Sequence, residues 1–378
     1  MCQEWRDILS SREEYWNHIV FIIDITSAEE LKTFIKYSGR TQPLNMYVLQ
    51  RKAHFGGDLD ELRFRERQQV KEAMRVLSPH FSRAQVLKFD VYSSSSLPHI
   101  PSLYNINHCL SAIELRCDVN DRLDVHPPAT SLSRRAYLRV RSLDIDGPNF
   151  MQLISHTNPP NTQGVLAPQS ALQRLSVSNL HPLLSHLSLS RTLSMTADPL
   201  MFKLRYLKLD KVAFDSTELQ TLQLRITQLE LIDIDGVVVA QFFNVALFPD
   251  NLELLRIVHC SLTSVRAFPP FDHLILEQYN EKGYYGLNVA EELIHRWGGS
   301  RLTLTGCPGL TQDIFEGFGD RPGGQARCPN MLHLQLNTSP GFSRKVWDKM
   351  LRARWVNYPR MQSVQTDGRY RYIPKVRV

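Results

Sequence analysis

A short hydrophobic pattern recurs along this chain from about residue 84 to residue 336. Each occurrence has two apolar residues separated by one other residue, and a further apolar residue usually precedes them, as in AQVLKF, LRYLKL and MLHLQL. Alternation with a period of two puts both apolar side chains on one face of a β-strand. The pattern therefore predicts eleven short strands, whose first apolar residues are Leu87, Ile113, Leu143, Leu175, Leu187, Leu207, Leu229, Leu255, Leu274, Leu302 and Leu334.

The spacing between these strands indicates a repeat architecture. Successive first residues are separated by 26, 30, 32, 12, 20, 22, 26, 19, 28 and 32 positions, and a leucine-rich repeat takes about 20–29 residues. We therefore expect an α/β fold, namely a leucine-rich-repeat solenoid with the shape of a horseshoe, in which each short parallel strand is buried by stacking on the next repeat.

Two places leave the register of the repeats open. The interval of 12 residues between Leu175 and Leu187 is too short for a full repeat, so one of these two steps is predicted to be a loop or a hairpin. In the segment LIDIDG, either Leu229 with Leu231 or Ile232 with Ile234 faces the core.

Two of the predicted repeats place a cysteine five residues after the first strand leucine. These are Cys260 in LRIVHCSL and Cys307 in LTLTGCPGL. Leucine-rich repeats favour Asn or Cys here, where the side chain turns inward and bonds to neighbouring loop backbone. The alternative is a reactive thiol, but the sequence near either cysteine supplies no evident base, so we expect structural cysteines.

The first 83 residues have a different pattern. HIVFIIDI and PLNMYVLQ predict two strands, SAEELKTFIKYSG predicts a helix with Ser27 and Glu30 as its capping box and Gly39 as its stop, and a long amphipathic helix spans about Asp60 to Leu77. Later helices are expected in NVAEELIHRW, TQDIFEGF and SRKVWDKMLRARW. The predicted organisation is a helical segment over residues 1–17, an α/β capping region over 18–83, and the solenoid with a C-terminal cap and basic tail over 84–378.

Composition narrows the expected surroundings and partners. The six cysteines among 378 residues form no CxxC pair, which favours reduced thiols in an intracellular compartment, cytoplasmic or nuclear. No apolar run reaches the roughly 18 residues of a membrane span, so we expect no membrane partner. The net charge is +6 and the C-terminal RYRYIPKVRV is basic. However, no helix-turn-helix, RNA-recognition or zinc-finger signature accompanies this charge, so nucleic acid is not an expected partner.

The opening stretch CQEWRDILSSREEYW resembles the second half of an F-box. Its matching positions are Cys2, Trp5, Arg6, Ile8, Leu9 and Trp16. The segments that follow, through KYSGRTQPLNMYV and VLSPHFSRAQVLKF, look like those of fungal F-box and leucine-rich-repeat proteins. An F-box normally begins with a leucine-proline segment and a first helix, and this chain starts after them. Either the start reflects a truncated gene model or the first helix has been lost.

The resemblance implies a non-catalytic substrate-recognition subunit of an SCF-type cullin ubiquitin ligase. Its docking residues on the Skp-type adaptor would be Cys2, Trp5, Ile8, Leu9 and Trp16. The tryptophans have an alternative role, which is to cap the end of the solenoid core. A second hypothesis keeps the solenoid as a protein-interaction scaffold with a vestigial F-box and no role in ubiquitin transfer.

Client binding is expected on the concave face of the solenoid. The residues between the paired apolar ones point away from the core, and their charges are mixed, which favours a protein or peptide client over a polyanion. The predicted client-binding residues are Lys88, Glu114, Asp144, Ser176, Ser188, Lys208, Glu230, Arg256, Thr303 and Gln335.

No sequence feature indicates an enzyme. The chain contains no GxSxG elbow, Walker A loop, HExxH or dinucleotide fingerprint. Two acidic pairs, Asp144 with Asp146 and Asp233 with Asp235, are a possible divalent metal site. Both pairs precede a glycine and fit an exposed strand face that leads into a turn. We therefore expect no catalytic residues, no bound metal and no cofactor.

Overall fold

The computed structural model of this chain describes sixteen segments. These are residues 12–50, 58–103, 110–121, 140–151, 172–180, 204–213, 221–248, 252–260, 271–277, 293–294, 297–307, 312–319, 328–337, 343–357, 361–366 and 369–372. The described residues belong to two compact units. The first unit contains those up to residue 180 together with Leu204, and the second contains those from Arg205 onward.

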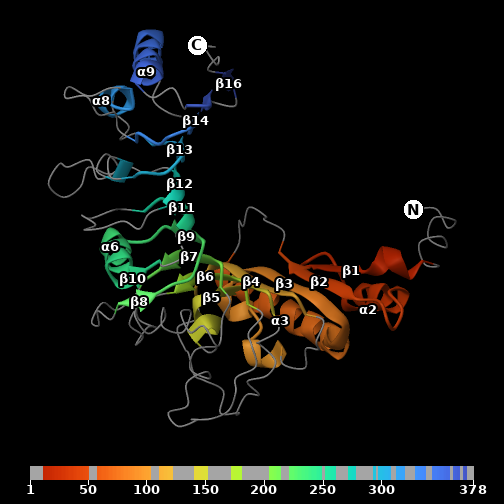
Figure 1. Cartoon of the computed structure of the whole chain (residues 1–378). Coiled ribbons are helices and arrows are strands. Elements are labelled where there is room, and N and C mark those ends of the chain that lie inside the picture. The colour runs from red at the N-terminus through yellow and green to blue at the C-terminus, as the bar shows by residue number, and fades with distance from the viewer. Residues whose placement is uncertain are drawn as a thin grey trace, which may run out of the picture. The chain divides into compact units, whose positions relative to one another are not determined.

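The first unit is built on a parallel sheet whose strands follow one another in chain order (Figure 1). In register across it lie Ile19, Met46, Leu87, Ile113, Leu143 and Leu175, each at most 5% exposed. The ladder of buried apolar residues thus includes the two strands before residue 84. The strands are β1 (His18–Ile22), β2 (Leu44–Leu49), β3 (Ala84–Ser93), β4 (Ala112–Val119), β5 (Ser142–Asp146) and β6 (Arg174–Leu180).

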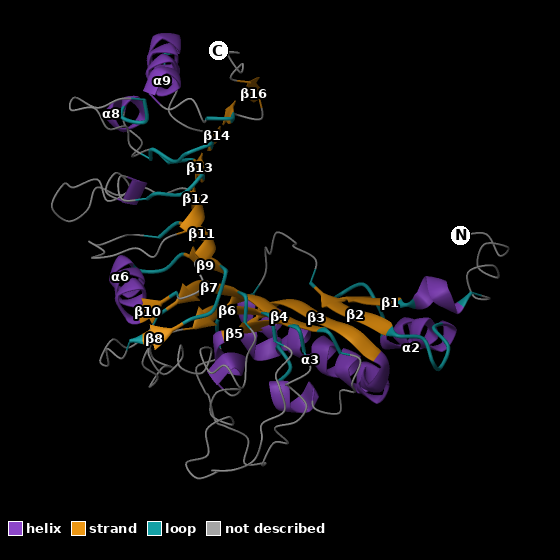
Figure 2. Ribbon diagram, in the orientation of Figure 1, coloured by secondary structure: helices purple, strands orange, loops and turns teal. Residues whose placement is uncertain are grey.

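Helices cover one side of this sheet (Figure 2). The predicted capping box is confirmed, because Ser27 Oγ accepts a hydrogen bond from Glu30 N (3.2 Å) and the Glu30 carboxylate accepts one from Ser27 N (2.8 Å). Gly39 follows the helix with a φ of +66°. The helical elements are η1 (Glu13–Trp16), α2 (Ala28–Tyr37), α3 (Leu59–Leu77), η2 (Ser78–Arg83), η3 (Ser94–Ser96) and η4 (Ile100–Leu103).

The second unit repeats the same plan. Its ladder consists of Leu207, Leu229, Leu255, Leu274, Leu302, Leu334 and Val364, none more than 1% exposed. The parallel strands are β7 (Tyr206–Val212), β9 (Gln228–Ile232), β11 (Leu252–Val258), β12 (Phe271–Glu277), β13 (Arg301–Thr305), β14 (His333–Asn337) and β15 (Ser363–Thr366). The last strand, β16 (Arg369–Tyr372), runs antiparallel to β15. A separate pair joins β8 (Leu222–Gln223) to β10 (Ala246–Leu247).

The helices of the second unit are α6 (Gly236–Val245), α8 (Gln312–Glu316) and α9 (Arg344–Asn357). The sequence predicts α8 and α9, and Ser343 caps α9 by accepting a hydrogen bond from Val346 N. It does not predict α6. The run GVVVAQFFNV lacks the polar stripe by which a surface helix is recognised in a sequence, and six of its ten residues are buried in the structure. The expected helix NVAEELIHRW is described at residues 293–294, which are helical, and at Trp297.

The predicted strands are confirmed wherever the structure describes them. Leu175 occupies the ladder position in β6, and Leu187 lies outside the described residues. In LIDIDG, Leu229 and Leu231 both face the core, and Ile234 is buried as well. The choice of Leu229 with Leu231 is therefore confirmed, because Ile232 is only half-buried, and Ile234 turns inward because Asp233 has a φ of +50° and turns the chain after the strand. The architecture is mixed α/β with open parallel ladders, which is consistent with an α/β solenoid.

Five strands end in the same backbone turn. The residue four positions after the ladder residue has a φ between +50° and +59°, and these residues are Asn179, Lys211, Asp233, His259 and Gly306. The residue that follows is at most 5% exposed in every case, and the set is Leu180, Val212, Ile234, Cys260 and Cys307. The left-handed conformation therefore directs the next side chain into the core as the chain leaves the sheet.

Changing Gly306 to Ala is expected to lower the free energy of unfolding by about 1 kcal/mol, because alanine pays for the left-handed conformation that glycine adopts freely. Urea denaturation followed by circular dichroism measures the change. Gly298→Ala is the control, since a Cβ there meets no atom within 4 Å and its φ is not left-handed. Equal stability of the two variants would contradict the expectation.

Candidate functional site

The residues between the paired ladder residues form a polar row on the face of each sheet that points away from the core. In the first unit this row contains Tyr47, Lys88, Glu114, Asp144 and Ser176 in direct register. In the second unit it contains Lys208, Glu230, Arg256, Ile275, Thr303, Gln335 and Gln365. The structure thus brings the predicted client-binding residues together within each unit, except Ser188, which lies outside the described residues.

The members of the polar rows are less exposed than the alternation predicts. Asp144 is 9% exposed and Ser176 is 7% exposed, so both are buried. The other predicted members that the structure describes are half-buried. Neighbouring strands lie about 4.8 Å apart, so each side chain is covered by those on either side.

Ion pairs link the polar row of the first unit. Lys88 Nζ lies 3.0 Å from Glu114, and Arg116 bridges Glu114 (3.6 Å) and Asp144 (2.6 Å). Burial alone would lower the pKa of Arg116, but the charge of Asp144 and its hydrogen bond outweigh that effect and raise the pKa. The alternating charges therefore compensate one another along the row.

Arg256 is the centre of a similar network in the second unit. Its guanidinium lies 3.0 Å from Glu230 on one neighbouring strand and donates two hydrogen bonds to Glu277 on the other, at 3.0 and 3.1 Å. The hydrogen bond to Glu277 raises the pKa of Arg256, burial opposes it, and the two negative charges add to the increase. Such a two-point contact fixes the side chain more firmly than a single surface ion pair.

The polar row changes character after Arg256. The next three members, Ile275, Thr303 and Gln335, carry no charge and lie on adjacent strands. Ile275 is missing from the predicted client-binding set, although its place between Leu274 and Leu276 marks it as a row member. This uncharged stretch offers an apolar contact and hydrogen-bonding groups, which is the composition of a protein-binding surface.

A histidine patch lies beside this uncharged stretch. We use this name for His273, Arg301 and His333, which are in register on β12, β13 and β14. His273 Nε2 lies 3.2 Å from Thr303 Oγ1, and His333 Nδ1 lies 2.8 Å from Ser363 Oγ. Burial and then the charge of Arg301 lower the pKa of both histidines, although Asp272 opposes this. Both rings are therefore mainly neutral at pH 7.

Arg301→Gln is expected to raise the pKa of both histidines, because it removes a positive charge that disfavours protonation. Ring-proton NMR titration measures this, with both wild-type rings titrating below the ordinary value of 6.5. The folded state binds fewer protons than the unfolded chain just below pH 6.5, so these histidines destabilise the fold as the pH falls through that range. Unchanged titration in the variant would contradict the proximity of Arg301.

The predicted structural cysteines are confirmed. Cys260 Sγ lies 3.3 Å from Val258 O and 3.4 Å from Leu231 O, and it accepts from Ile234 N. Cys307 Sγ donates to Leu276 O at 3.4 Å. Burial raises the pKa of Cys260 to about 11 and also raises the pKa of Cys117. These thiols are therefore poor nucleophiles at neutral pH.

Cys260 and Cys307 are expected to resist iodoacetamide at pH 8 in the folded protein and to react within minutes in guanidinium chloride. Burial keeps both sulfurs out of contact with the reagent, and it raises the pKa of Cys260, which keeps that thiol protonated. Peptide mass spectrometry reads the alkylation of each site. Fast labelling of Cys260 under native conditions would contradict the buried placement.

The two acidic pairs do not lie on exposed strand faces. Asp146 is 0% exposed and accepts a hydrogen bond from Asn149 Nδ2 at 2.7 Å. Asp233 and Asp235 follow strand β9. Asp233 lies 3.2 Å from His259, and Asp235 caps α6 by accepting from Val237 N (2.8 Å). The expectation of an exposed strand face is wrong for Asp144 and Asp146, which are buried, whereas Asp233 and Asp235 are exposed but lie in the turn after the strand.

Within the parts of the chain that the structure describes, no group of three or more His, Cys, Asp or Glu residues is placed to hold a metal ion. No helix within those same parts has the length and apolar character needed to cross a membrane.

The predicted adaptor-binding residues are mostly outside the described part of the chain. This holds for Cys2, Trp5, Ile8 and Leu9. Trp16 is described in η1, half-buried, and its ring stacks on Phe34 (5.7 Å between centroids) and tilts against Tyr37 (5.1 Å), both on α2. The observed contacts of Trp16 are therefore with its own chain.

Comparisons with known proteins add no relative. No protein-family model, no curated protein and no solved structure matches this chain.

Proposed function

We propose that this protein is a non-catalytic recognition subunit that binds a client protein on the polar face of its sheets. The observation that carries this proposal is the in-register polar row, whose mixed charged and uncharged side chains offer repeated contacts to an extended partner. The leucine-rich-repeat identity of the solenoid belongs to the same proposal. It is supported by the spacing of the strands and by the inward Cys260 and Cys307.

The charges of the polar rows favour a protein client. Lys88, Glu114 and Arg116 are already compensated by one another and by Asp144, so the row has no excess charge with which to attract a polyanion. Burying the uncharged stretch of Ile275, Thr303 and Gln335 against a client costs less desolvation free energy than burying the charged members of the row. We therefore place the energetic centre of client binding there.

The proposal includes docking to a Skp-type adaptor of an SCF-type cullin ubiquitin ligase. Its support is the F-box-like residues Cys2, Trp5, Ile8, Leu9 and Trp16. Large apolar side chains in a short segment are favoured anchors in protein interfaces. In this arrangement the N-terminal segment holds the ligase and the polar row presents the client.

Affinity purification of the tagged full chain with quantitative mass spectrometry tests both parts. The wild type is expected to retain adaptor, cullin and client. Trp5→Ala is expected to lose adaptor and cullin at least tenfold and keep the client. Ile275→Glu is expected to lose the client at least tenfold and to keep adaptor and cullin. Arg352→Ala, an exposed change on α9, serves as the control. Failure to recover adaptor and cullin with the wild type would overturn the ligase role.

A protein-interaction scaffold without a role in ubiquitin transfer is the second candidate. The packing of Trp16 on Phe34 and Tyr37 favours it, because a residue that covers the edge of its own fold is less available to an adaptor. In the same purification, a client that depends on Ile275 but comes without adaptor or cullin would establish this candidate.

A further inference from the structure

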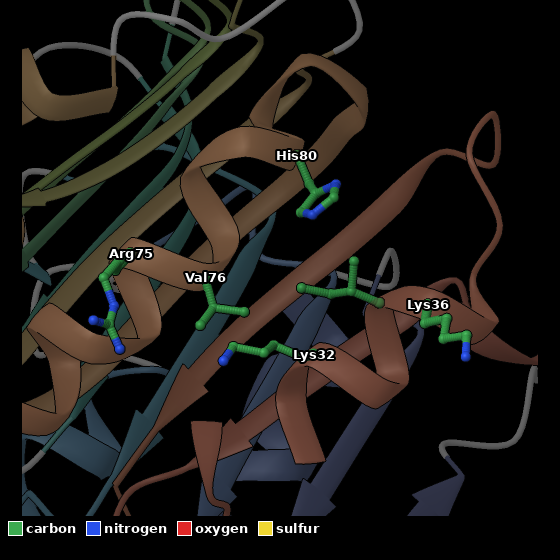
Figure 3. A pocket seen from close by; sticks show the side chains of 6 residues that line it. Lys32, Lys36, Arg75, Val76 and His80 are labelled. Carbon is green, nitrogen blue, oxygen red and sulfur yellow. The ribbon is translucent and has the colours of Figure 1, made fainter. Parts of the chain in front are cut away.

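A pocket of about 500 Å³ lies on the helical side of the first unit, between α2 and the end of α3 (Figure 3). Figure 3 shows Lys32 and Lys36 on α2 across from Arg75 and Val76 on α3, with His80 on the following turn η2. The six lining residues are Lys32, Ile35, Lys36, Arg75, Val76 and His80. No residue of the polar rows is among the described residues that line this pocket.

The floor of the pocket is apolar. Ile35 belongs to the buried face of α2 and is 6% exposed, and Val76 belongs to the buried face of α3 and is 8% exposed. The two side chains come from neighbouring helices, so the floor is held in place by the packing of α2 and α3. An apolar side chain of a ligand gains free energy when it is buried against this floor, whereas a ligand that carries only charged groups does not.

The rim of the pocket is positively charged. Lys32 pairs with Glu29 at 2.5 Å and Arg75 pairs with Glu72 at 3.5 Å, but these are surface pairs within a helix that form and break at little cost. Lys36 has no acidic partner among the residues that the structure describes. Three cations against two acids leave an excess of one positive charge, carried by Lys36.

His80 adds a hydrogen-bonding group to this rim. Burial, and then the nearby charge of Arg83, lower the pKa of His80, so the ring is mainly neutral at pH 7. Arg83 itself is turned toward the backbone, where its guanidinium donates to Gly39 O at 2.6 Å and to Ser38 Oγ at 3.0 Å. The ligand-facing charge of the pocket therefore comes from Lys32, Lys36 and Arg75.

We propose that this pocket docks an acidic peptide segment of a partner protein, with one apolar side chain on the floor and flanking carboxylates on the rim. The charge of the rim selects carboxylates, and the apolar floor selects a side chain between them. A nucleic acid or an anionic membrane surface would meet the same cations but would leave Ile35 and Val76 unused. The pocket is distinct from the proposed client-binding surface and gives the protein a second attachment point.

Fluorescence anisotropy with a defined probe tests this inference. The probe is a fluorescein-labelled peptide with one leucine flanked on each side by glutamates, and the matched peptide has serine in place of leucine. Lys36→Glu is expected to weaken binding of the leucine peptide at least tenfold. Arg67→Glu, an exposed charge reversal on α3 away from the pocket lining, is expected to change it less than twofold. Raising the salt concentration is expected to weaken binding further.

A peptide of reversed charge distinguishes the loss of a charge contact from misfolding of the variant. A peptide with lysines in place of the glutamates is expected to bind Lys36→Glu better than the wild type. Equal binding of the leucine and serine peptides, equal effects of Lys36→Glu and Arg67→Glu, or tighter binding of duplex DNA or phosphatidylserine vesicles would each overturn the inference. Because Ile275→Glu leaves this pocket unchanged, peptide binding by that variant separates the pocket from the proposed client surface.

Discussion

Arg354→Ala is expected to lower the free energy of unfolding of the second unit by about 3–5 kcal/mol, since several buried acceptors lose their donor together. Arg354 lies on α9, is 1% exposed, and is the largest fully buried side chain described. Its guanidinium donates to Phe318 O (3.0 Å), Cys328 O (2.6 Å), Pro329 O (3.2 Å) and Met331 O (3.1 Å). These carbonyls belong to the segments that follow α8 and precede β14.

Hydrogen exchange and urea denaturation measure this effect. Amides of β13 and β14 are expected to lose protection, whereas those of β2 and β3 in the first unit keep it. Arg352→Ala, on the exposed side of the same helix, is the matched control and is expected to stay within about 0.5 kcal/mol of the wild type. Arg354→Lys is expected to fall between them, because an ammonium has three donors and no planar fork. A cost for Arg354→Ala no larger than that of the control would contradict this role.

Glu66→Ala is expected to lower the free energy of unfolding of the first unit by about 2–4 kcal/mol. Glu66 lies on α3 and is 1% exposed. Its carboxylate accepts hydrogen bonds from Tyr92 N (2.6 Å) and Ser93 N (3.0 Å) at the end of β3. Alanine leaves both buried N–H groups without this acceptor. Urea denaturation measures the change in the free energy of unfolding, and hydrogen exchange shows whether the loss of protection lies at β3.

The effect of Glu66→Ala is also expected to depend on pH. Burial raises the pKa of Glu66 above 4.5, despite the opposing hydrogen bonds from Tyr92 N and Ser93 N. The folded state therefore binds more protons than the unfolded chain just above pH 4.5, and the contribution of Glu66 falls as the pH rises. The difference between wild type and variant should be larger at pH 4.5 than at pH 7. Glu72→Ala, which removes an exposed pair partner on the same helix, should not show this cost.

Local patterns were sufficient for much of the fold. Leu87, Leu255 and Leu302 were located by the period of two alone, because a buried strand face needs no long-range information to be recognised. The helix that begins after Ser27 was predicted with its capping box for the same reason, since all the groups involved lie within four residues. The inward placement of Cys260 followed from its fixed distance to Leu255.

Other features needed groups that are distant in the sequence. Glu66 reads as one more charge on an amphipathic helix, yet its partners are 26 and 27 residues away. Arg354 reads as part of a basic run, yet its carbonyl acceptors are 23–36 residues away. The pocket residues Lys36 and Arg75 come from separate helices, and no pattern along the chain brings them together.

The sequence by itself determined the repeating strands, the face each strand buries and the caps of the early helices, because those depend on side-chain period and neighbouring hydrogen bonds. Only the tertiary structure decided which polar residues remain open to a partner. It paired Glu114 with Lys88 and Arg116, buried Asp144 and Asp146, and left Lys36 at the rim of a pocket. The physical reason is that exposure and charge compensation depend on neighbours across strands and helices, which spacing along the chain does not specify.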